Sequence, residues 1–278
     1  MRVVKTIAGM KELRPQLAPP VGFVPTMGYL HEGHLSLVTY AKDENVNVVV
    51  SIFVNPTQFG PKEDFACYPR DLDRDLAMLE RVGTDVVFAP TTEDMYPPGF
   101  DTWVEVGELS KPLEGASRST HFRGVTTVVA KLFNIVQPNK AYFGQKDAQQ
   151  ALVLTKMAAD LNMNLEVVTC PTKREPDGLA MSSRNIYLNE EERKAAKVLY
   201  KALLRAKQQY QAGEKGAARL RQGMIDLIKS EPLANIDYVS IASNETLKEI
   251  EAMITPPALV SLAVKFGNTR LIDNVVLE

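Results

Sequence analysis

The chain is poor in the residues that build disulfide frameworks, zinc clusters and membrane anchors. Its 278 residues include two cysteines, three histidines and one tryptophan. Cys67 and Cys170 stand far apart and form no CxxC pair, which excludes a disulfide scaffold and a zinc knuckle. No apolar run is long enough for a transmembrane helix, and the N-terminus lacks the apolar core of a signal peptide. We therefore expect a cytoplasmic protein that is neither exported nor inserted into a membrane.

An excess of one charge is also missing. The 32 basic and 34 acidic residues give a net charge of -2, and no basic stripe stands out. Nucleic acid is therefore not an expected partner. The hydrophobic share of 45% is enough for an ordinary buried core. The length fits one large α/β domain or two smaller ones.

Short apolar runs alternate with amphipathic stretches up to Cys170. The expected strands are 21–25, 46–54, 85–89, 140–143 and 165–170. The expected helices are 34–42, 72–81, 125–136 and 147–161. Strands that alternate with helices form parallel sheets covered on both faces. The run 46–54 is rich in β-branched residues, as expected for a strand buried on both faces. The pattern predicts an α/β fold with a Rossmann-like, doubly wound parallel sheet.

The pattern changes after Pro171. A loop is expected over 172–188, and Asn189 looks like a helix N-cap with Glu192 three residues on. That helix should run to about Ala212 and end at Gly213. A helix over 216–229 and strands over 236–242, 258–266 and 270–276 should follow. We predict a Rossmann-like domain over 1–175 and a smaller α+β C-terminal domain over 176–278.

Two of the three histidines lie in Thr-Met-Gly-Tyr-Leu-His-Glu-Gly-His, residues 26–34, between an expected strand and an expected helix. Helix N-termini present free N–H groups and a positive dipole end, which suits a phosphate. Gly28 and Gly33 allow the backbone to approach a ligand closely. His31 and His34 are three apart, so both can face one ligand from a first helical turn. We interpret the segment as a triphosphate-binding turn.

Two simpler interpretations of the histidine pair compete with this one. A zinc helix usually spaces its histidines four apart, whereas His31 and His34 are three apart, and His121 is the only further histidine. A plain surface pair is the stronger competitor. It does not explain the two glycines or the position between a strand and a helix.

A second segment, Phe-Val-Asn-Pro-Thr-Gln-Phe-Gly at 53–60, follows the buried strand. Ligands bind at the carboxyl ends of strands in open α/β sheets. Asn55 and Gln58 offer neutral donors and acceptors that suit a hydroxy acid. An Asn-Pro turn is the alternative interpretation, but a turn alone has no need of Gln58.

Two further segments are weak alone. In Tyr-Phe-Gly-Gln-Lys-Asp-Ala-Gln-Gln, residues 142–150, Lys146 suits a phosphate and Gln150 lies one helical turn later, although most lysines are simply solvated. The polar loop 178–185, Gly-Leu-Ala-Met-Ser-Ser-Arg-Asn, suits a mobile phosphate clamp. An ordinary interdomain linker is the stronger interpretation of that loop in isolation.

Other residues give fainter signals. Arg118, His121 and Arg123 are expected in a loop before the 125–136 helix, from which they could reach a carboxylate or phosphate, although a structural role is the stronger interpretation of each alone. Cys67 and Cys170 are expected to be inert core thiols, and Trp103 to be a core residue.

Together the four segments resemble the pantothenate synthetase family. That family carries TMG-x-LHEGH, NP-x-QF, FG-x-KD and GLAMSSRN segments, and all four stand here in that order. The HEGH run is also similar to the HIGH signature of the wider nucleotidylyltransferase and class I synthetase superfamily. The Met-Ser-Ser-Arg run is similar to its KMSKS counterpart. The resemblance covers essentially the whole chain.

The resemblance implies specific roles for site residues. The catalytic residues would be His34, His31, Lys146 and Arg184. The ATP site would be lined by Met27, Gly28, Tyr29, Leu30, His31, Glu32, Gly33, His34, Gly144, Gln145, Lys146, Asp147, Lys173, Met181, Ser182, Ser183 and Arg184. Pantoate would be bound by Gln58, Gln150 and Asn55. No protein ligands to a metal are implied, although Mg²⁺ would accompany ATP.

The resemblance also implies the reaction. ATP-dependent adenylation of pantoate would be followed by attack of β-alanine, releasing AMP, and the C-terminal domain would close over the ATP site of a homodimer. A nucleotidylyltransferase acting on a phosphorylated acceptor and a non-catalytic ATP-binding regulator remain as alternatives. The sequence departs from the family pattern twice. Tyr29 stands where alanine is common, and Lys173 where a small apolar residue is common.

Overall fold

The computed structural model describes residues 1–61 and 63–278. The chain divides into two compact units. Unit 1 comprises Met1–Gln145 and Gln149–Pro171, and unit 2 comprises Lys146–Ala148 and Thr172–Glu278. The domain boundary expected at residue 175 stays a prediction, because compactness alone does not show that either part folds independently.

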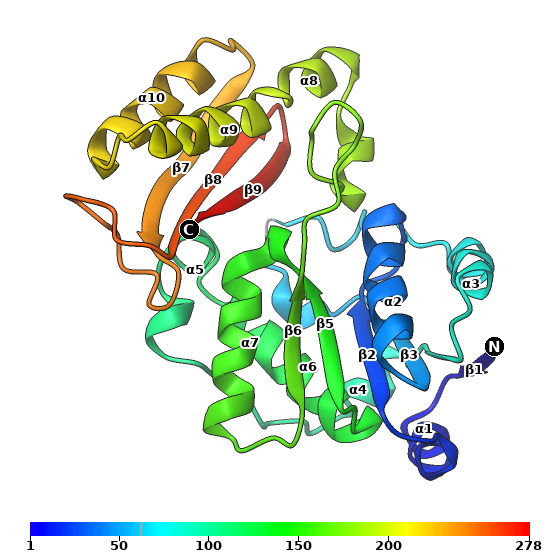
Figure 1. Ribbon diagram of the computed structural model, residues 1–278. Coiled ribbons are helices and arrows are strands. Elements are labelled where there is room, and N and C mark those ends of the chain that lie inside the picture. The colour runs from blue at the N-terminus through cyan, green and yellow to red at the C-terminus, as the bar shows by residue number, and fades with distance from the viewer. Residues whose placement is uncertain (62) are drawn as a thin grey trace. The chain divides into compact units, whose positions relative to one another are not determined.

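Unit 1 contains a six-stranded sheet whose strands pair in parallel in the order β1-β4-β3-β2-β5-β6. Figure 1 shows β6, β5, β2 and β3 side by side. The strands are β1 (Arg2–Val4), β2 (Val21–Thr26), β3 (Asn47–Ile52), β4 (Val86–Phe88), β5 (Lys140–Gly144) and β6 (Glu166–Cys170). The predicted parallel sheet is therefore confirmed. The short edge strand β1 was not predicted.

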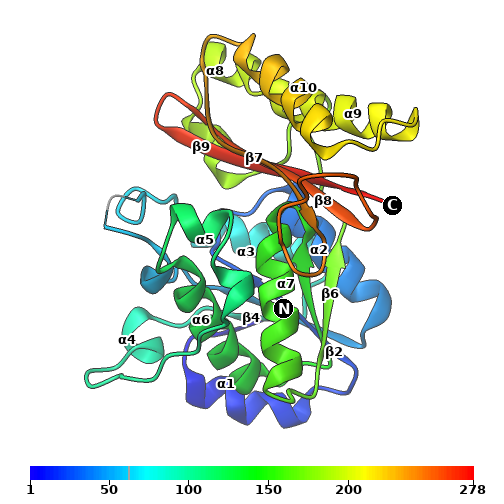
Figure 2. The same cartoon turned by 90° about the vertical axis from the view of Figure 1, so that its left-hand side faces the viewer.

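Helices cover both faces of this sheet. They are α1 (Ile7–Leu13), α2 (Glu32–Glu44), α3 (Leu72–Arg81), α6 (His121–Val136) and α7 (Ala148–Asp160). Phe23 and Val49 point into a core with α1, α6 and α7, whereas Val24 and Val50 point into a core with α2 and α3. Successive strand residues thus serve opposite faces. Figure 2 looks toward the side that carries α6 and α7, and the doubly wound arrangement is confirmed.

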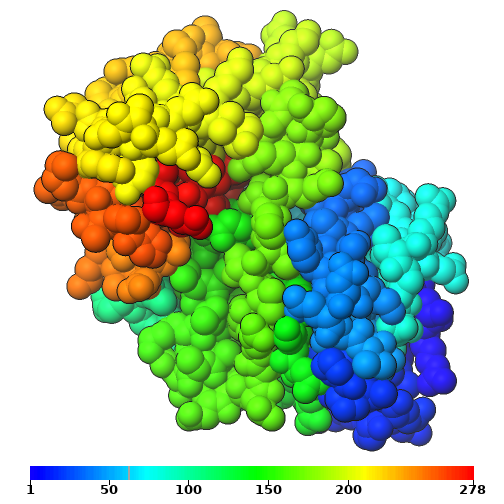
Figure 3. Space-filling view, in the orientation of Figure 1, coloured from blue at the N-terminus to red at the C-terminus, as the bar shows by residue number. Residues whose placement is uncertain are grey.

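Unit 2 is built on three antiparallel strands, β7 (Ala234–Ser243), β8 (Ala258–Phe266) and β9 (Thr269–Leu277), in that order. Leu199, Leu203 and Leu220 from α9 (Val198–Gln211) and α10 (Ala217–Lys229) share a core with the strands. The space-filling view shows this helical layer in yellow beside the red C-terminal strand (Figure 3). The predicted α+β character of this part is confirmed.

The single helix expected from Asn189 to Ala212 was wrong. The structure has α8 (Glu190–Ala195) and then α9. Between them Ala196 (φ -58°, ψ -19°) and Lys197 (φ -59°, ψ -21°) take 3₁₀-type dihedral angles, and the Leu199 N–H donates to the Ala196 carbonyl at 3.2 Å. A tightened turn therefore separates two helices that periodicity alone joins.

Short elements complete the fold. They are α4 (Thr92–Met95), α5 (Glu114–Ser117) and the 3₁₀ helices η1 (Arg14–Gln16), η2 (Pro56–Gln58), η3 (Glu108–Ser110), η4 (Gln145–Asp147) and η5 (Ser183–Tyr187). In the described parts of the chain, no helix has the length and apolarity to cross a membrane.

Candidate active site

The order of the strands indicates that a ligand would bind at the carboxyl ends of β2 and β5 in the unit 1 sheet. The chain leaves β2 toward β3 and leaves β5 toward β6, on the other side. Ligands of open α/β sheets bind at such a switch point, beyond the carboxyl ends of the strands. The β2–β5 ladder stops at the pairs Gly22–Lys140 and Phe23–Ala141, so the two strands are unpaired nearer those ends. The predicted segments beginning at Met27 and Gly144 follow these two strands.

The histidine pair lies at the start of α2, as predicted. His31 is the N-cap, and its Nδ1 accepts the Gly33 N–H at 3.1 Å. The Nδ1 of His34 accepts the His31 N–H at 3.3 Å. The ring centroids are 4.0 Å apart. A neutral ring whose Nδ1 accepts carries its proton on Nε2, so both histidines have an Nε2–H donor for a phosphoryl oxygen.

Most backbone N–H groups of this turn, which were expected to be free for a ligand, have partners inside the protein. The N–H of Gly28 donates to Thr26 Oγ1, and those of Tyr29 and Leu30 donate to Asp75. The N–H groups of His31 and Gly33 are taken by the imidazoles, and those of His34 and Leu35 by the His31 carbonyl. Inward capping satisfies the groups that would otherwise meet an anion. The imidazole N–H groups are the side-chain donors of this turn that suit a phosphate.

A buried network surrounds Gln58 after β3. The Asn55 amide donates to Gln58 Oε1 and to the Gly124 carbonyl, both at 3.1 Å, and its Oδ1 accepts the Tyr96 hydroxyl at 2.8 Å. Asn55 is 1% exposed and committed to these protein partners. The predicted direct contact of Asn55 with substrate is not tested, but its visible task is to hold Gln58.

The donor end of Gln58 has a weaker partner. Its Nε2 donates to the sulfur of Met27 at 2.9 Å, and a thioether is a poor acceptor. Gln58 is nevertheless buried, at 9% exposure. A hydroxyl or carboxylate oxygen would accept this N–H better than the thioether does. The amide is therefore held by its acceptor end, with its donor end suited to an oxygen-rich ligand.

The backbone of Gln58 is fixed from α6. His121 Nδ1 donates to the Gln58 carbonyl at 2.9 Å, and His121 Nε2 accepts from Arg118 at 3.1 Å. Arg118 in turn pairs with Glu63 at 2.6 Å. Burial, together with the charge of Arg118, lowers the pKa of His121 from 6.5 to about 4, so the ring is neutral at pH 7. Sequence reasoning placed His121 and Arg123 in a loop, whereas α6 begins at His121.

Close packing brings α6 onto this segment. A side chain at Gly124 would place its Cβ 2.3 Å from the Thr57 carbonyl oxygen and 2.7 Å from Gln58 Cα. Only glycine fits so short an approach. The position of Gln58 is thus determined by α6 as well as by β3.

The remaining predicted segments belong partly to unit 2. After Gly144, Lys146 Nζ lies 3.3 Å from the Asp147 carboxylate, and the Lys146 carbonyl accepts the Asn274 amide at 2.9 Å. Gln150 lies in the first turn of α7, where its neighbour Gln149 is buried against the backbone carbonyls of Leu109 and Pro112.

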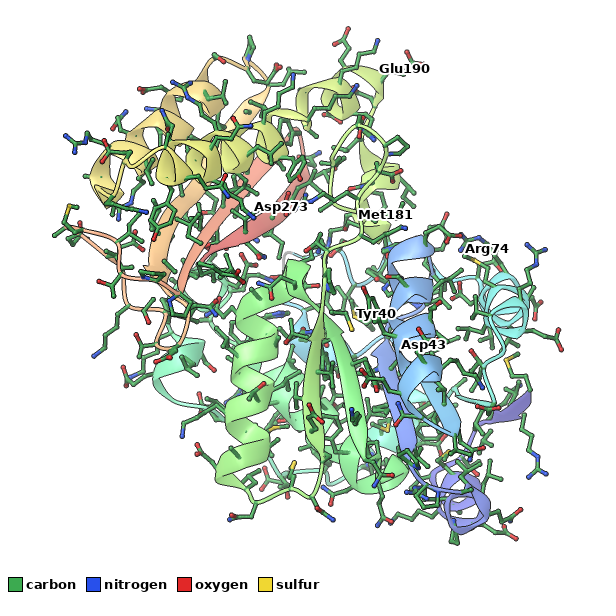
Figure 4. The ribbon with its side chains drawn as sticks, in the orientation of Figure 1. Tyr40, Asp43, Arg74, Met181, Glu190 and Asp273 are labelled. Atoms are coloured by element: carbon green, nitrogen blue, oxygen red, sulfur yellow. The ribbon has the colours of Figure 1, made fainter. Side chains whose placement is uncertain are left out.

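Several hydrogen bonds hold the serine loop of unit 2, and its predicted mobility stays a prediction. The Met181 N–H donates to the Lys173 carbonyl at 3.0 Å, and Ser182 caps η5 by accepting the Arg184 N–H at 3.3 Å. Arg174 forms a two-pronged pair with Asp273, at 2.6 and 2.9 Å, which anchors the start of the loop to β9. Figure 4 labels Asp273 on β9 and Met181 in the loop. The Lys173 carbonyl is thus occupied within the loop.

The predicted ATP residues divide between the units. Met27–His34, Gly144 and Gln145 lie in unit 1, as do Asn55, Gln58 and Gln150, whereas Lys146, Asp147, Lys173 and Met181–Arg184 lie in unit 2. That both sets bind one ATP molecule stays a prediction. Within unit 1, the structure brings His31 to His34, and Asn55 to Gln58 and Met27.

The family model for pantoate-β-alanine ligase matches residues 2–276. The chain belongs to the pantoate-β-alanine ligase family. It is 59% identical over 278 residues to a pantothenate synthetase of Roseiflexus castenholzii, covering 100% of both chains. A pantothenate synthetase structure from Thermus thermophilus has 50% identity and a TM-score of 0.94, with 99% of each chain covered.

A more distant solved relative carries ligands. It is the pantoate-β-alanine ligase from Francisella tularensis in complex with β-γ ATP and β-alanine. Its identity is 35% and its TM-score 0.81, with 99% of this chain and 97% of that chain covered. The similarity thus extends over both units of the chain.

Sequence reasoning missed two residues that hold the site, Asp75 and Tyr96. It named His121 but missed that this side chain holds the Gln58 backbone. Asp75 had a signal that could have found it. It lies on α3 four residues before the buried Leu79, on the same face of the helix. A carboxylate in an apolar stripe needs partners inside the protein.

Proposed function

We propose that the chain joins pantoate to β-alanine at the expense of ATP, through a pantoyl adenylate, releasing pyrophosphate and then AMP. The observation that carries the proposal is that two kinds of hydrogen-bond donor follow neighbouring strands. Imidazole Nε2–H donors follow β2, and the buried amide donor of Gln58 follows β3. The full-length family match supports the choice of pantoate as the oxygen-rich acid.

In the first step the pantoate carboxylate attacks the α-phosphorus of ATP in line and displaces pyrophosphate. A carboxylate near its ordinary pKa is already ionised at neutral pH, so no general base is required. The protein's work is to align the reactants and to stabilise charge on the phosphoryl oxygens. We assign that work to His34 and His31, with Lys146 and Arg184 as cationic contributors.

Pantoate binding falls to the amides. Gln58 offers its donor to a hydroxyl or carboxylate oxygen, Gln150 provides a second amide, and Asn55 holds Gln58 in place. A neutral amide site discriminates in favour of a hydroxy acid over a phosphorylated acceptor, which would demand cations. This distinguishes the proposal from a nucleotidylyltransferase.

Mg²⁺ fits the proposal as a companion of ATP. Among residues 1–61 and 63–278, no group of three or more His, Cys, Asp or Glu side chains could hold a metal ion. The Asp147 carboxylate, paired with Lys146 at 3.3 Å, could accept hydrogen bonds from water on such an ion. When bound, Mg²⁺ would neutralise charge on the β- and γ-phosphates.

In the second step the β-alanine amine attacks the acyl carbon of the adenylate, and AMP leaves with the phosphate oxygen. An adenylate exposed to water would hydrolyse, so the site must be closed during this step. We assign the closure to the smaller C-terminal domain, with Met181, Ser182, Ser183 and Arg184 facing the nucleotide. The homodimer and the cytoplasmic location are also parts of the proposal. The homodimer rests on family resemblance, and the location on the two unpaired cysteines and the apolar pattern of the sequence.

A product assay tests the function directly. The purified chain is incubated with ATP, Mg²⁺, pantoate and β-alanine, and the products are separated by chromatography. Pantothenate, AMP and pyrophosphate should appear in equal amounts. ADP and phosphate would show an acyl phosphate route, a product that keeps its AMP would show nucleotidyl transfer, and ATP binding without turnover would show a regulator.

A further inference from the structure

A buried carboxylate from α3 holds the turn that precedes the histidine pair. Asp75 is 1% exposed. Its Oδ2 accepts the Tyr29 N–H and its Oδ1 accepts the Leu30 N–H, both at 2.7 Å. Burial raises the pKa of this carboxyl, and the two N–H groups and Arg74 oppose the rise. None of the roles proposed so far involves Asp75.

The backbone of the turn is shaped around this carboxylate. Gly28 has φ +79° and Tyr29 has φ +49°, the left-handed region that residues with side chains disfavour. A Cβ at Gly28 would lie 3.0 Å from Asp75 Oδ2. Two successive N–H groups therefore converge on one point, as they do in the concavities that bind external anions. Here the anion is supplied by the protein itself.

Arg74 contacts the same turn through a backbone carbonyl and an aromatic ring. Its Nη2 donates to the Leu30 carbonyl at 2.9 Å, and its guanidinium lies 4.9 Å from the centroid of the Tyr29 ring. Figure 4 labels Arg74 on α3. Neighbouring residues of one helix thus hold both the N–H and the carbonyl of Leu30, the residue before the N-cap His31.

We propose that Asp75 is a positioning residue for the nucleotide-activating histidines, and this rests on the proposed function. By filling the anion concavity of the turn, the carboxylate fixes the direction in which α2 begins and hence where His31 and His34 direct their Nε2–H groups. It also closes the N–H groups of Tyr29 and Leu30 to the triphosphate. Phosphate recognition at this turn is then left to the imidazoles.

The test compares two isosteric neutralisations on α3. Asp75→Asn removes the charge and places an NH₂ group against one of the two N–H donors. Asp73→Asn neutralises an exposed carboxylate of the same helix and is the matched control. In steady-state assays, Asp75→Asn should lower kcat/KM for ATP by about 10-fold to 100-fold, as expected for the loss of a charged hydrogen-bond acceptor. The pantoate KM should stay within about twofold, as should every constant of the control.

A general loss of structure would act differently. It would lower the activity toward both substrates together and leave no selective effect on ATP. If Asp75→Asn does not fold, Arg74→Gln decides instead. It removes an exposed guanidinium that contacts the Leu30 carbonyl, the Tyr29 ring and the Asp75 carboxylate, and it leaves both Asp75 hydrogen bonds to the turn in place. That variant should lower kcat/KM for ATP by about twofold to tenfold without changing the pantoate KM.

The positioning role is overturned if the folded Asp75→Asn variant, or Arg74→Gln in its place, keeps wild-type kcat/KM for ATP or weakens both substrates equally. Failure of the proposed function is recognised separately, because the wild type would then form no AMP. In that case ATP binding by calorimetry still compares Asp75→Asn with wild type, where at least about tenfold weaker binding supports the inference and equal binding overturns it.

Discussion

The carboxyl ends of β2 and β3 lie side by side, yet the segments that follow them are held by different side-chain chemistry. The turn after β2 is held by a buried anion, Asp75, which takes two backbone N–H groups. The segment after β3 is held chiefly by neutral groups, the Asn55 amide and the neutral imidazole of His121, with Arg118 as a more distant charged donor to the Gln58 carbonyl at 3.4 Å. The first leaves imidazole donors for an anion, and the second leaves an amide donor for an oxygen-rich acid. The difference indicates a division of labour between nucleotide and acid.

The largest expected effect concerns His34. His34→Ala should slow turnover by about a hundredfold to a thousandfold, the usual effect of losing a donor that stabilises charge in the transition state. Because His34 Nδ1 also caps α2, His34→Asn is the matched variant, with an acceptor near the Nδ1 position but no Nε2–H. Both variants should be slow in single-turnover formation of pantoyl adenylate, and His34→Asn should keep wild-type stability. A rate within a few-fold of wild type would transfer the role to His31 or Lys146.

The next effect is a pH dependence of the free energy of unfolding, which we attribute to His121 in the segment after β3. His121 has a pKa of about 4 in the folded chain, against 6.5 unfolded. Between these values the unfolded chain binds more protons, so the free energy of unfolding should fall as the pH falls from 6.5 to 4. The full loss is roughly 3 kcal/mol.

Urea unfolding between pH 7 and 4 measures this contribution. His121→Asn keeps a donor for the Gln58 carbonyl and does not titrate, so it should lose less stability than wild type over that range. Parallel pH profiles for the two chains would show that His121 is not the titrating group.

Gln58→Ala tests the acid side of the comparison. Loss of hydrogen bonds to pantoate in a closed site costs about 1–3 kcal/mol, which raises the pantoate KM by about fivefold to 150-fold. The ATP KM should change little, because the amide donor of Gln58 is assigned to pantoate and the nucleotide to the imidazoles. Steady-state kinetics with each substrate varied will separate the two. A variant with a raised ATP KM and an unchanged pantoate KM would reverse our assignment.

The smallest effect should come from Tyr96. Tyr96→Phe deletes the hydroxyl that donates to Asn55 Oδ1 at 2.8 Å. One neutral hydrogen bond contributes about 0.5–1.5 kcal/mol, so the pantoate KM should rise by about twofold to tenfold. The comparison sharpens if Arg74→Gln, on the other segment, raises only the ATP KM. If both variants raised the KM for pantoate and for ATP equally, the two segments would not serve different substrates.

Regular elements were predictable where periodicity is strong. The valine-rich strand β3 is buried on both faces, as predicted. The histidine pair lies at the start of the helix that follows β2, also as predicted. Short or irregular elements were not. β1 has three residues, and the tightened turn at Ala196 and Lys197 interrupts no hydrophobic pattern. Periodicity carries no information on a strand too short to alternate.

Burial of single side chains was the other failure. Cys67 and Trp103 were expected in the core, yet Cys67 is exposed and Trp103 is 43% exposed, under the guanidinium of Arg123 at 4.9 Å. Cys170 is buried, as predicted. The supports of the site were hidden for a related reason. Asp75 and Tyr96 lie far in sequence from the residues that they hold, and only tertiary packing brings them together.

The central claim is that the segment after β2 activates ATP and the segment after β3 binds pantoate. Exchange of labelled pyrophosphate into ATP without β-alanine tests it most directly. Wild type should exchange only when pantoate is present. Gln58→Ala should recover a near-wild-type rate at saturating pantoate, whereas His34→Asn should stay slow at every pantoate concentration. Exchange that needs no pantoate, or a His34→Asn variant that pantoate restores while Gln58→Ala stays slow, would contradict the account.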